Sequence, residues 1–229
     1  MSGARDTILG SIRKSLKRGP LSAEQAARLE HRLKTPRANV IPARARVSGR
    51  RRTDLFVDEA ERVSTTVARV ADAAGVPGAI ASYLAEHNLP ATLKVAPDPA
   101  LKTIPWSEKP VLSVVEGRGE DGDAVSVTGA FAGVAETGTL VLLSGPEHPS
   151  TLNLLPETHI VVLRRDQLVG SYEDAWALLR VMGRGMPRTV TMVTGPSRTA
   201  DIEQTLQLGA HGPRRLHIVL IGGAGDDAE

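Results

Sequence analysis

The stretch from Thr194 to Ile221, TGPSRTADIEQTLQLGAHGPRRLHIVLI, carries the strongest signals of the fold. It follows one apolar, β-branched run, Thr189–Val193, and it ends in another, Leu216–Ile221. Runs of this length and composition are typical of buried strands, and we expect a helix over Thr199–Leu208 between them. The segment therefore predicts a strand–helix–strand crossover within a parallel sheet.

The same alternation extends through the second half of the chain. Strands are predicted over Ala124–Val134, Thr139–Leu143 and His159–Leu163, and a helix over Tyr172–Met182. The first half predicts helices over Asp58–Ala73 and Gly78–His87 and strands over Ala91–Val95 and Val111–Val115. Strands alternating with helices predict the α/β class, with an open, mostly parallel sheet flanked by helices.

The N-terminal segment differs from the rest in charge. Residues 1–52 hold fourteen Lys/Arg and three Asp/Glu, whereas the remainder holds fourteen and twenty-three. Apolar spacing predicts helices over Asp6–Leu16 and Ala26–Leu33, the second preceded by a capping box over Ser22–Gln25. We therefore expect a basic helical extension and linker over residues 1–53, an α/β domain over 54–222, and a flexible tail over 223–229.

This extension is predicted to pack on a partner protein or to form a homo-oligomer with a second copy. No aromatic side chains are interleaved with its arginines, which argues against nucleic-acid binding.

Composition excludes several classes of site. The chain has no cysteine, which excludes disulfides, thiol catalysis, and zinc or iron–sulfur sites held by its own thiolates. The histidines lack ligand-like spacing, so we expect no metal site. No apolar run approaches the roughly 20 residues of a membrane-spanning helix, and the first residues lack the apolar region of a secretory signal. These features predict a cytoplasmic protein.

The turn after Thr189–Val193 has two interpretations. Ligands of open α/β sheets gather beyond the carboxyl ends of strands, where helix N-termini offer free amides to anions. Gly195 would allow a close approach of the backbone, and Ser197, Arg198 and Thr199 would add donors. Alternatively, the polar residues only cap the predicted helix, with Asp201 and Glu203 satisfying first-turn amides. The residues alone leave both interpretations open.

Three further polar clusters lie between predicted elements. His211 and Gly212 lie in a Gly-Pro turn next to two arginines, which suits anion binding, acid–base chemistry or a purely structural turn. Glu136 lies between two apolar strands, either as a solvent-facing turn residue or as a carboxylate held in a cleft. Glu157 and His159 would share one face of a strand.

Four segments, in this order, resemble the lactate utilization protein C family (LutC/YkgG type). They are Ala135–Thr139 (AETGT), Leu154–Ile160 (LLPETHI), Gly195–Glu203 (GPSRTADIE) and Gly209–Pro213 (GAHGP). The resemblance is strong over about Ala124–Leu220 and weak in the N-terminal third.

The resemblance implies a fold of the NagB/RpiA/CoA transferase-like type, a class that also contains 5-formyltetrahydrofolate cyclo-ligases. It implies an accessory component of L-lactate oxidation to pyruvate, acting with iron–sulfur partner proteins that ligate the clusters themselves. The chain's own cofactor stays unknown. A glutamate forms the acyl-enzyme intermediate in related CoA transferases, so an alternative is a CoA-transferase-like or cyclo-ligase-like enzyme that uses Glu136.

The four clusters together predict one cleft for a small anionic ligand. Its candidate catalytic residues are Glu136 and His211. Its candidate ligand-binding residues are Thr137, Gly138, Thr139, Gly195, Ser197, Arg198, Thr199, Asp201 and Gly212.

Overall fold

The structure is a computed structural model that describes residues 3–17, 19–183, 185–202, 205–208 and 211–222. For residues 198–202 and 205–208 it describes the backbone alone. The chain divides into two units, Met1–Val40 and Ile41–Glu229.

The first unit consists of two helices, α1 (Gly3–Ser15) and α2 (Ala23–Lys34), neither of which has a buried residue. The predicted capping box is confirmed: the Ser22 hydroxyl accepts from the Gln25 amide at 3.2 Å, and the Gln25 side chain accepts from the Ser22 amide at 3.1 Å. These two bonds satisfy donors that the start of α2 would otherwise leave free.

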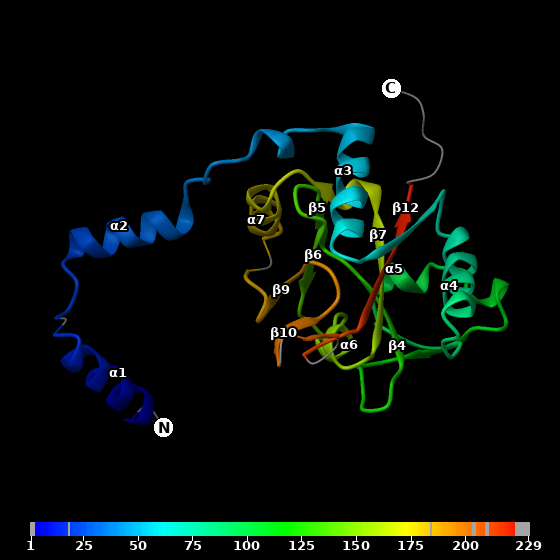
Figure 1. Cartoon of the computed structure of the whole chain (residues 1–229). Helices are drawn as coiled ribbons and strands as arrows, with labels where there is room; N and C mark the ends of the chain where they lie inside the picture. Colours follow the sequence, from blue (N-terminus) through cyan, green and yellow to red (C-terminus); the bar gives the residue numbers. More distant parts are fainter. Residues whose placement is uncertain (1–2, 18, 184, 203–204, 209–210, 223–229) are drawn as a thin grey trace. The chain divides into compact units, whose positions relative to one another are not determined.

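A six-stranded, fully parallel sheet forms the centre of the second unit (Figure 1). Its order is β1-β12-β7-β4-β2-β3, with strands β1 (Thr66–Val70), β2 (Thr92–Val95), β3 (Ser113–Glu116), β4 (Val125–Gly129), β7 (Thr158–Arg164) and β12 (Arg215–Ile221). The central strands β7 and β12 are buried over most of their length. Near-continuous apolar runs suit such strands because both of their faces are covered.

A second sheet of four strands packs on one face of the first. Its order is β8-β5-β6-β9, with strands β5 (Ala132–Val134), β6 (Thr139–Leu143), β8 (Leu168–Val169) and β9 (Val190–Val193). Leu140 and Leu142 of β6 belong to the same apolar cluster as Val161 and Ile218 of the large sheet. Helix α3 (Gly49–Arg62) adds Phe56 to this cluster.

The remaining helices complete the layers (Figure 1). Helix α4 (Gly75–Glu86) and the short α5 (Pro99–Lys102) cover the opposite face of the large sheet, and α7 (Tyr172–Val181) covers the outer face of the small one. The short α6 (Thr151–Leu154) leads into β7. Single 3₁₀ turns occupy Ala43–Ala45, Trp106–Glu108 and Arg165–Gln167. Every helix in the described part of the chain is too short or too polar to span a bilayer.

The α/β class and the mostly parallel sheet are confirmed, but three element predictions are wrong. The predicted helix over Asp58–Ala73 is the end of α3 followed by strand β1. Its valines fit a helical spacing, but the short β-branched run after Ser64 suits a strand equally well, and pairing with β12 decides between them. Helix α3 also begins at Gly49, inside the segment predicted as a linker.

The predicted strand Ala124–Val134 is two strands in two different sheets. Strand β4 ends at Gly129, where a Cβ atom would lie 2.6 Å from Oδ2 of Asp98. The chain then crosses to the small sheet and continues as β5. A continuous run of small and apolar residues does not reveal such a crossing.

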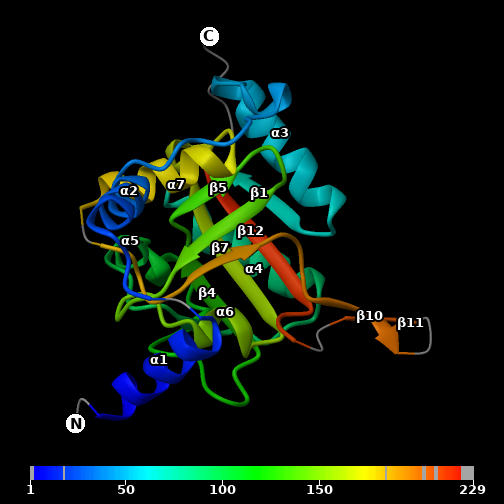
Figure 2. The same ribbon diagram turned by 90° about the vertical axis from the view of Figure 1, so that its left-hand side faces the viewer.

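The predicted helix over Thr199–Leu208 is an antiparallel pair, β10 (Arg198–Ile202) and β11 (Thr205–Leu208), which extends away from the large sheet (Figure 2). Thr205–Leu208 alternates polar and apolar residues with the period of a strand. The helix N-terminus that the anion hypothesis invoked after Gly195 is therefore not formed by the described residues.

Candidate functional site

A cavity of about 520 Å³ lies where the loop after β9 meets the beginnings of β7 and β12. It is lined by Val63, Asn153, Leu154, His159, Thr191, Met192, Val193, Thr194, Gly195, Pro196, Ser197, His211, Gly212, Pro213 and Leu216. We call it the β9 cavity. We expected the ligand site beyond the carboxyl ends of strands. Only β9 meets this expectation, because the central strands β7 and β12 of the large sheet reach the cavity with their amino ends.

The β9 cavity brings together three of the four predicted clusters. Gly195 and Ser197 come from the loop after β9, and His211 and Gly212 come from the turn before β12. One backbone hydrogen bond joins these two loops: the Ser197 amide donates to the Pro213 carbonyl at 2.8 Å.

Gly195 is required in its loop by its backbone conformation. Its φ of +77° lies in the left-handed region, and a Cβ atom there would lie 2.5 Å from the carbonyl oxygen of Val63. Only glycine combines this conformation with so close an approach of two backbones.

His159 is fully buried and lines the β9 cavity. Burial lowers the pKa of its imidazole to about 3, so the ring is neutral at pH 7. Its Nε2 lies 2.8 Å from the Thr128 hydroxyl, whereas its Nδ1 is buried with no hydrogen-bond partner in the described structure.

The Thr128 contact decides which nitrogen of His159 carries the proton. If the Thr128 hydroxyl donates to Nε2, Nδ1 carries the proton and only one donor is unsatisfied. The opposite tautomer would leave both the hydroxyl proton and the Nδ1 lone pair unsatisfied. The favoured tautomer therefore makes Nδ1–H an orphaned donor in a ring that lines the cavity.

Asn153 adds a second polar group that the predicted site did not include. It lies on α6, it is buried, and it lines both the β9 cavity and a smaller cavity of about 230 Å³. The Ser126 hydroxyl fixes α6 by donating to the Leu152 carbonyl at 2.7 Å. The neighbouring segment Leu154–Ile160 belongs to the predicted clusters, but no sequence pattern singles out the Asn153 amide.

Glu136 lies in a separate, buried corner and is not among the residues that line the β9 cavity. Its Oε1 accepts weakly from the Tyr172 amide at 3.5 Å, at the start of α7, and its Oε2 is buried without a partner in the described structure. Gly138, in the same turn, packs so closely on α3 that a Cβ atom would lie 2.3 Å from the Ala60 nitrogen.

A set of hydroxyl groups connects this corner with the cavity wall. The Thr139 hydroxyl lies 2.7 Å from that of Thr137, 2.8 Å from that of Tyr172, and 2.7 Å from that of Thr194, which lines the β9 cavity. Thr139 is thus hydrogen-bonded to a residue that lines the cavity, and Thr137 is hydrogen-bonded to Thr139. Neither of the two is itself among the lining residues.

Three predicted ligand-binding residues, Arg198, Thr199 and Asp201, belong to β10, and their side chains lie outside the described residues. No group of three or more acidic or histidine side chains that could hold a metal ion occurs in the described part of the chain.

Comparisons with known proteins match this part of the molecule. The LUD domain family model matches residues 123–221. A lactate utilization protein C from Deinococcus radiodurans is 36% identical over 160 residues, which cover 66% of this chain and 70% of that protein. An uncharacterized protein from Neisseria meningitidis is 44% identical over 94 residues, covering 41% of this chain and 40% of that protein.

A solved structure supports the fold. The crystal structure of a DUF162 family protein from Deinococcus radiodurans has a TM-score of 0.55 and 28% sequence identity, over 77% of this chain and all of that chain. Several relatives match over less than half of their own length, as does the lactate utilization protein C of Bacillus subtilis, at 33% identity over 42% of each chain.

Proposed function

The chain belongs to the LUD domain family, and from this membership we propose that it is an accessory component of a system that oxidises L-lactate to pyruvate. The names of its relatives support the lactate role. The absence of cysteine supports a division of labour, because this chain cannot hold an iron–sulfur cluster with its own thiolates. Iron–sulfur partner proteins would then carry the electrons.

We propose that the β9 cavity is the anion-binding cleft of this component and that it takes a small carboxylate. The supporting observation is the orphaned Nδ1–H of His159, which a carboxylate oxygen would satisfy. The Asn153 amide and the Ser197 hydroxyl would provide further neutral donors. Val63, Leu154 and Met192 offer apolar surface for the carbon chain of the acid.

Calorimetry with L-lactate and with pyruvate tests this assignment. We expect Ser197→Ala and Asn153→Ala each to weaken binding about tenfold, the loss expected for one hydrogen bond to a charged group. His31→Ala, in the N-terminal unit, is the control and should leave the affinity unchanged. Heat signals that are identical in the native chain and in both cavity variants would refute the cleft.

Glu136 supports a second candidate function, acyl transfer of the CoA-transferase type. The observation in its favour is the buried, unpartnered Oε2. Its position outside the cavity lining ranks this function second. Mass spectrometry of the chain after incubation with acyl-CoA tests for a covalent adduct on Glu136, with Glu136→Gln as the control. Absence of any added mass would dismiss this function.

We also propose that the Met1–Val40 unit attaches the chain to a partner or to a second copy. It holds nine Lys/Arg and three Asp/Glu, and its helices expose Ile8, Ile12, Leu29 and Leu33. The second unit has its own core, so removal of residues 1–40 is a fair test. A smaller assembly by light scattering is expected, and an unchanged mass together with unchanged co-purification would count against this role.

A further inference from the structure

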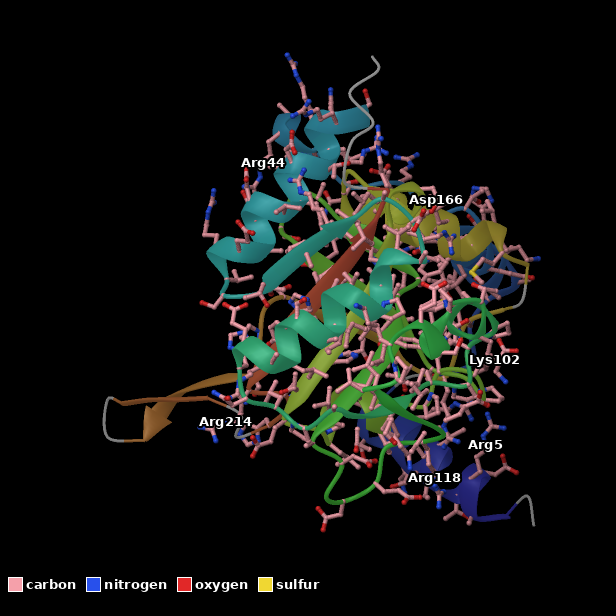
Figure 3. All side chains as sticks on the ribbon, turned by 90° about the vertical axis from the view of Figure 1, so that its right-hand side faces the viewer. Arg5, Arg44, Lys102, Arg118, Asp166 and Arg214 are labelled. Carbon is pink, nitrogen blue, oxygen red and sulfur yellow. The ribbon has the colours of Figure 1, made fainter. Side chains whose placement is uncertain are left out.

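Thr194, the first residue after β9, lines the β9 cavity. This cavity lies at the edge of the large sheet where β12 begins, which Arg214 marks in Figure 3, whereas Asp166 lies toward the end where β12 finishes. The Thr194 hydroxyl lies 2.7 Å from the hydroxyl of Thr139, which is fully buried and is not among the lining residues. What Thr194 offers to a ligand therefore depends on which of these two hydroxyl groups donates.

Thr139 belongs to a closed set of hydroxyl groups. Its oxygen also lies 2.7 Å from that of Thr137 and 2.8 Å from that of Tyr172. The Thr137 hydroxyl donates to the Tyr172 oxygen at 3.2 Å, and this contact closes a triangle of three hydrogen bonds. With the bond to Thr194, four hydroxyl groups share four hydrogen bonds. We call Thr137, Thr139, Tyr172 and Thr194 the hydroxyl network.

The supply of protons decides the direction of the bond between Thr139 and Thr194. A hydroxyl group carries one proton and can accept two hydrogen bonds. The triangle needs one proton for each of its bonds, so it uses the protons of all three of its members. Thr139 then has no proton left for the remaining bond, and Thr194 must donate it. Thr139 accepts this bond and one bond of the triangle, which fills the capacity of its oxygen.

Thr194 is therefore available to a ligand as an acceptor only. Its single proton is engaged with Thr139, and its oxygen keeps a lone pair for a donor in the cavity. A ligand hydroxyl can donate to this oxygen. A ligand carbonyl carries no proton, so it would place one acceptor against another and leave both unsatisfied.

We propose that Thr194 makes the β9 cavity selective for α-hydroxy acids over the corresponding α-keto acids. This inference rests on the proposed carboxylate cleft and adds the group that recognises the carbon next to the carboxylate. A site that hydrogen-bonds a ligand hydroxyl discriminates against the analogue without it, because the polar group of the site then loses its partner. Thr139 and Tyr172 are positioning residues, since they act on the ligand through Thr194. In a system that oxidises lactate to pyruvate, such a cleft retains the substrate and releases the product.

Calorimetry of the full chain with L-lactate, pyruvate and propionate tests the proposal, because these acids share a carboxylate and differ at the neighbouring carbon. We expect L-lactate to bind about tenfold more tightly than propionate, which lacks the hydroxyl, and pyruvate to bind no better than propionate. Thr194→Val should reduce the affinity for lactate to that for propionate and leave propionate binding unchanged. Thr194→Ser keeps the hydroxyl and should keep the preference.

Tyr172→Phe is the sharper test, because it alters the hydroxyl network without changing a residue that lines the cavity. Loss of the phenol hydroxyl leaves two hydrogen bonds for three protons, so Thr139 can donate to Thr194 and the Thr194 proton can turn to a ligand. We expect the preference for lactate over pyruvate to fall from about tenfold toward equality, chiefly through tighter binding of pyruvate. Tyr83→Phe removes the other tyrosine hydroxyl of the chain, on α4, and should keep the preference.

The outcomes separate this inference from the cleft itself. Equal affinities for all three acids, in a chain whose binding still weakens in Ser197→Ala, would overturn the selectivity and leave the cleft standing. An unchanged preference in Tyr172→Phe would overturn the hydroxyl network as its origin. No binding of any of the three acids would overturn the cleft and this inference together. If Tyr172→Phe fails to fold, as circular dichroism would show, the comparison of Thr194→Val with Thr194→Ser still decides the question.

Discussion

Acidification should destabilise this protein through His159, and the structure sets the size of the effect. Burial lowers the pKa of this imidazole from 6.5 to about 3 in the folded chain. The unfolded chain therefore takes up a proton as the pH falls through 6.5, whereas the folded chain does not. Stability contributed by a histidine with a lowered pKa is present above the unfolded value and is lost as the pH falls below it.

The expected loss between pH 7 and pH 5 is about 2 kcal/mol. At pH 7 roughly a quarter of the unfolded chains carry the proton on this histidine, and at pH 5 nearly all do. The folded pKa enters this result only by lying well below 5, because the folded chain then binds almost no proton at either pH. His217, buried against Tyr83 with a pKa lowered to about 4 by burial and by the nearby His87, should contribute a similar loss.

Urea unfolding at both pH values measures this loss in the native chain and in His159→Gln. Glutamine keeps a hydrogen-bonding group near Thr128 but does not titrate. The variant should therefore lose about 2 kcal/mol less than the native chain on acidification, whatever its own stability at pH 7. His31→Gln, at an exposed position, is the control. An identical pH dependence in His159→Gln and the native chain would refute the neutral, buried imidazole.

Substitutions at Gly138 and Ser126 test the packing that positions the site, and Gly122 provides a control. Gly138→Ala should destabilise by roughly 2–4 kcal/mol in urea, because its φ is +63° and the new methyl group would meet Ala60. Gly122→Ala shares the positive φ, at +91°, but nothing lies within 4 Å, so about 1 kcal/mol is expected, and equal losses at both glycines would contradict the contact. Ser126→Ala should cost about 1–2 kcal/mol by leaving the Leu152 carbonyl unsatisfied, and a loss within error of zero would contradict that bond.

The central strands could be predicted from sequence because their signals are local. Strands β7 and β12 are long, β-branched apolar runs, and no other element accommodates such a run so well. The capping box at Ser22 is equally local, since three consecutive peptide units determine it. Where the relevant interactions lie within a few residues, the pattern identified the element.

The wrong predictions concern elements whose structure is determined by contacts between residues far apart in the sequence. Val67 and Val70 continue the helical spacing of Val63, which caps α3, and only the pairing of β1 with β12 selects a strand for them. At the crossing from β4 to β5, Gly129 lies close to Asp98, a residue far away in the sequence, and no local pattern reveals this contact. The second sheet could not be predicted because two of its three pairings, β5 with β8 and β6 with β9, join segments that are not consecutive.

Only part of the candidate site could be predicted, because contacts between residues far apart in the sequence decide which clusters meet. Gly195, Ser197, His211 and Gly212 line one cavity because the loop after β9 and the turn before β12 are joined by a backbone hydrogen bond. Glu136 lies elsewhere, because its turn packs against α3 and the start of α7.

The two-sheet packing explains why the β9 cavity opens at the amino ends of β7 and β12. The small sheet lies on the Val161 face of the large one, and its strand β9 runs antiparallel to β6. The carboxyl end of β9 therefore reaches the edge where β7 and β12 begin. The cavity at this edge thus gathers uncharged polar groups around His159, among them the Asn153 amide and the Ser197 hydroxyl. Because these groups are neutral, a ligand with a single negative charge suits this edge better than one with two.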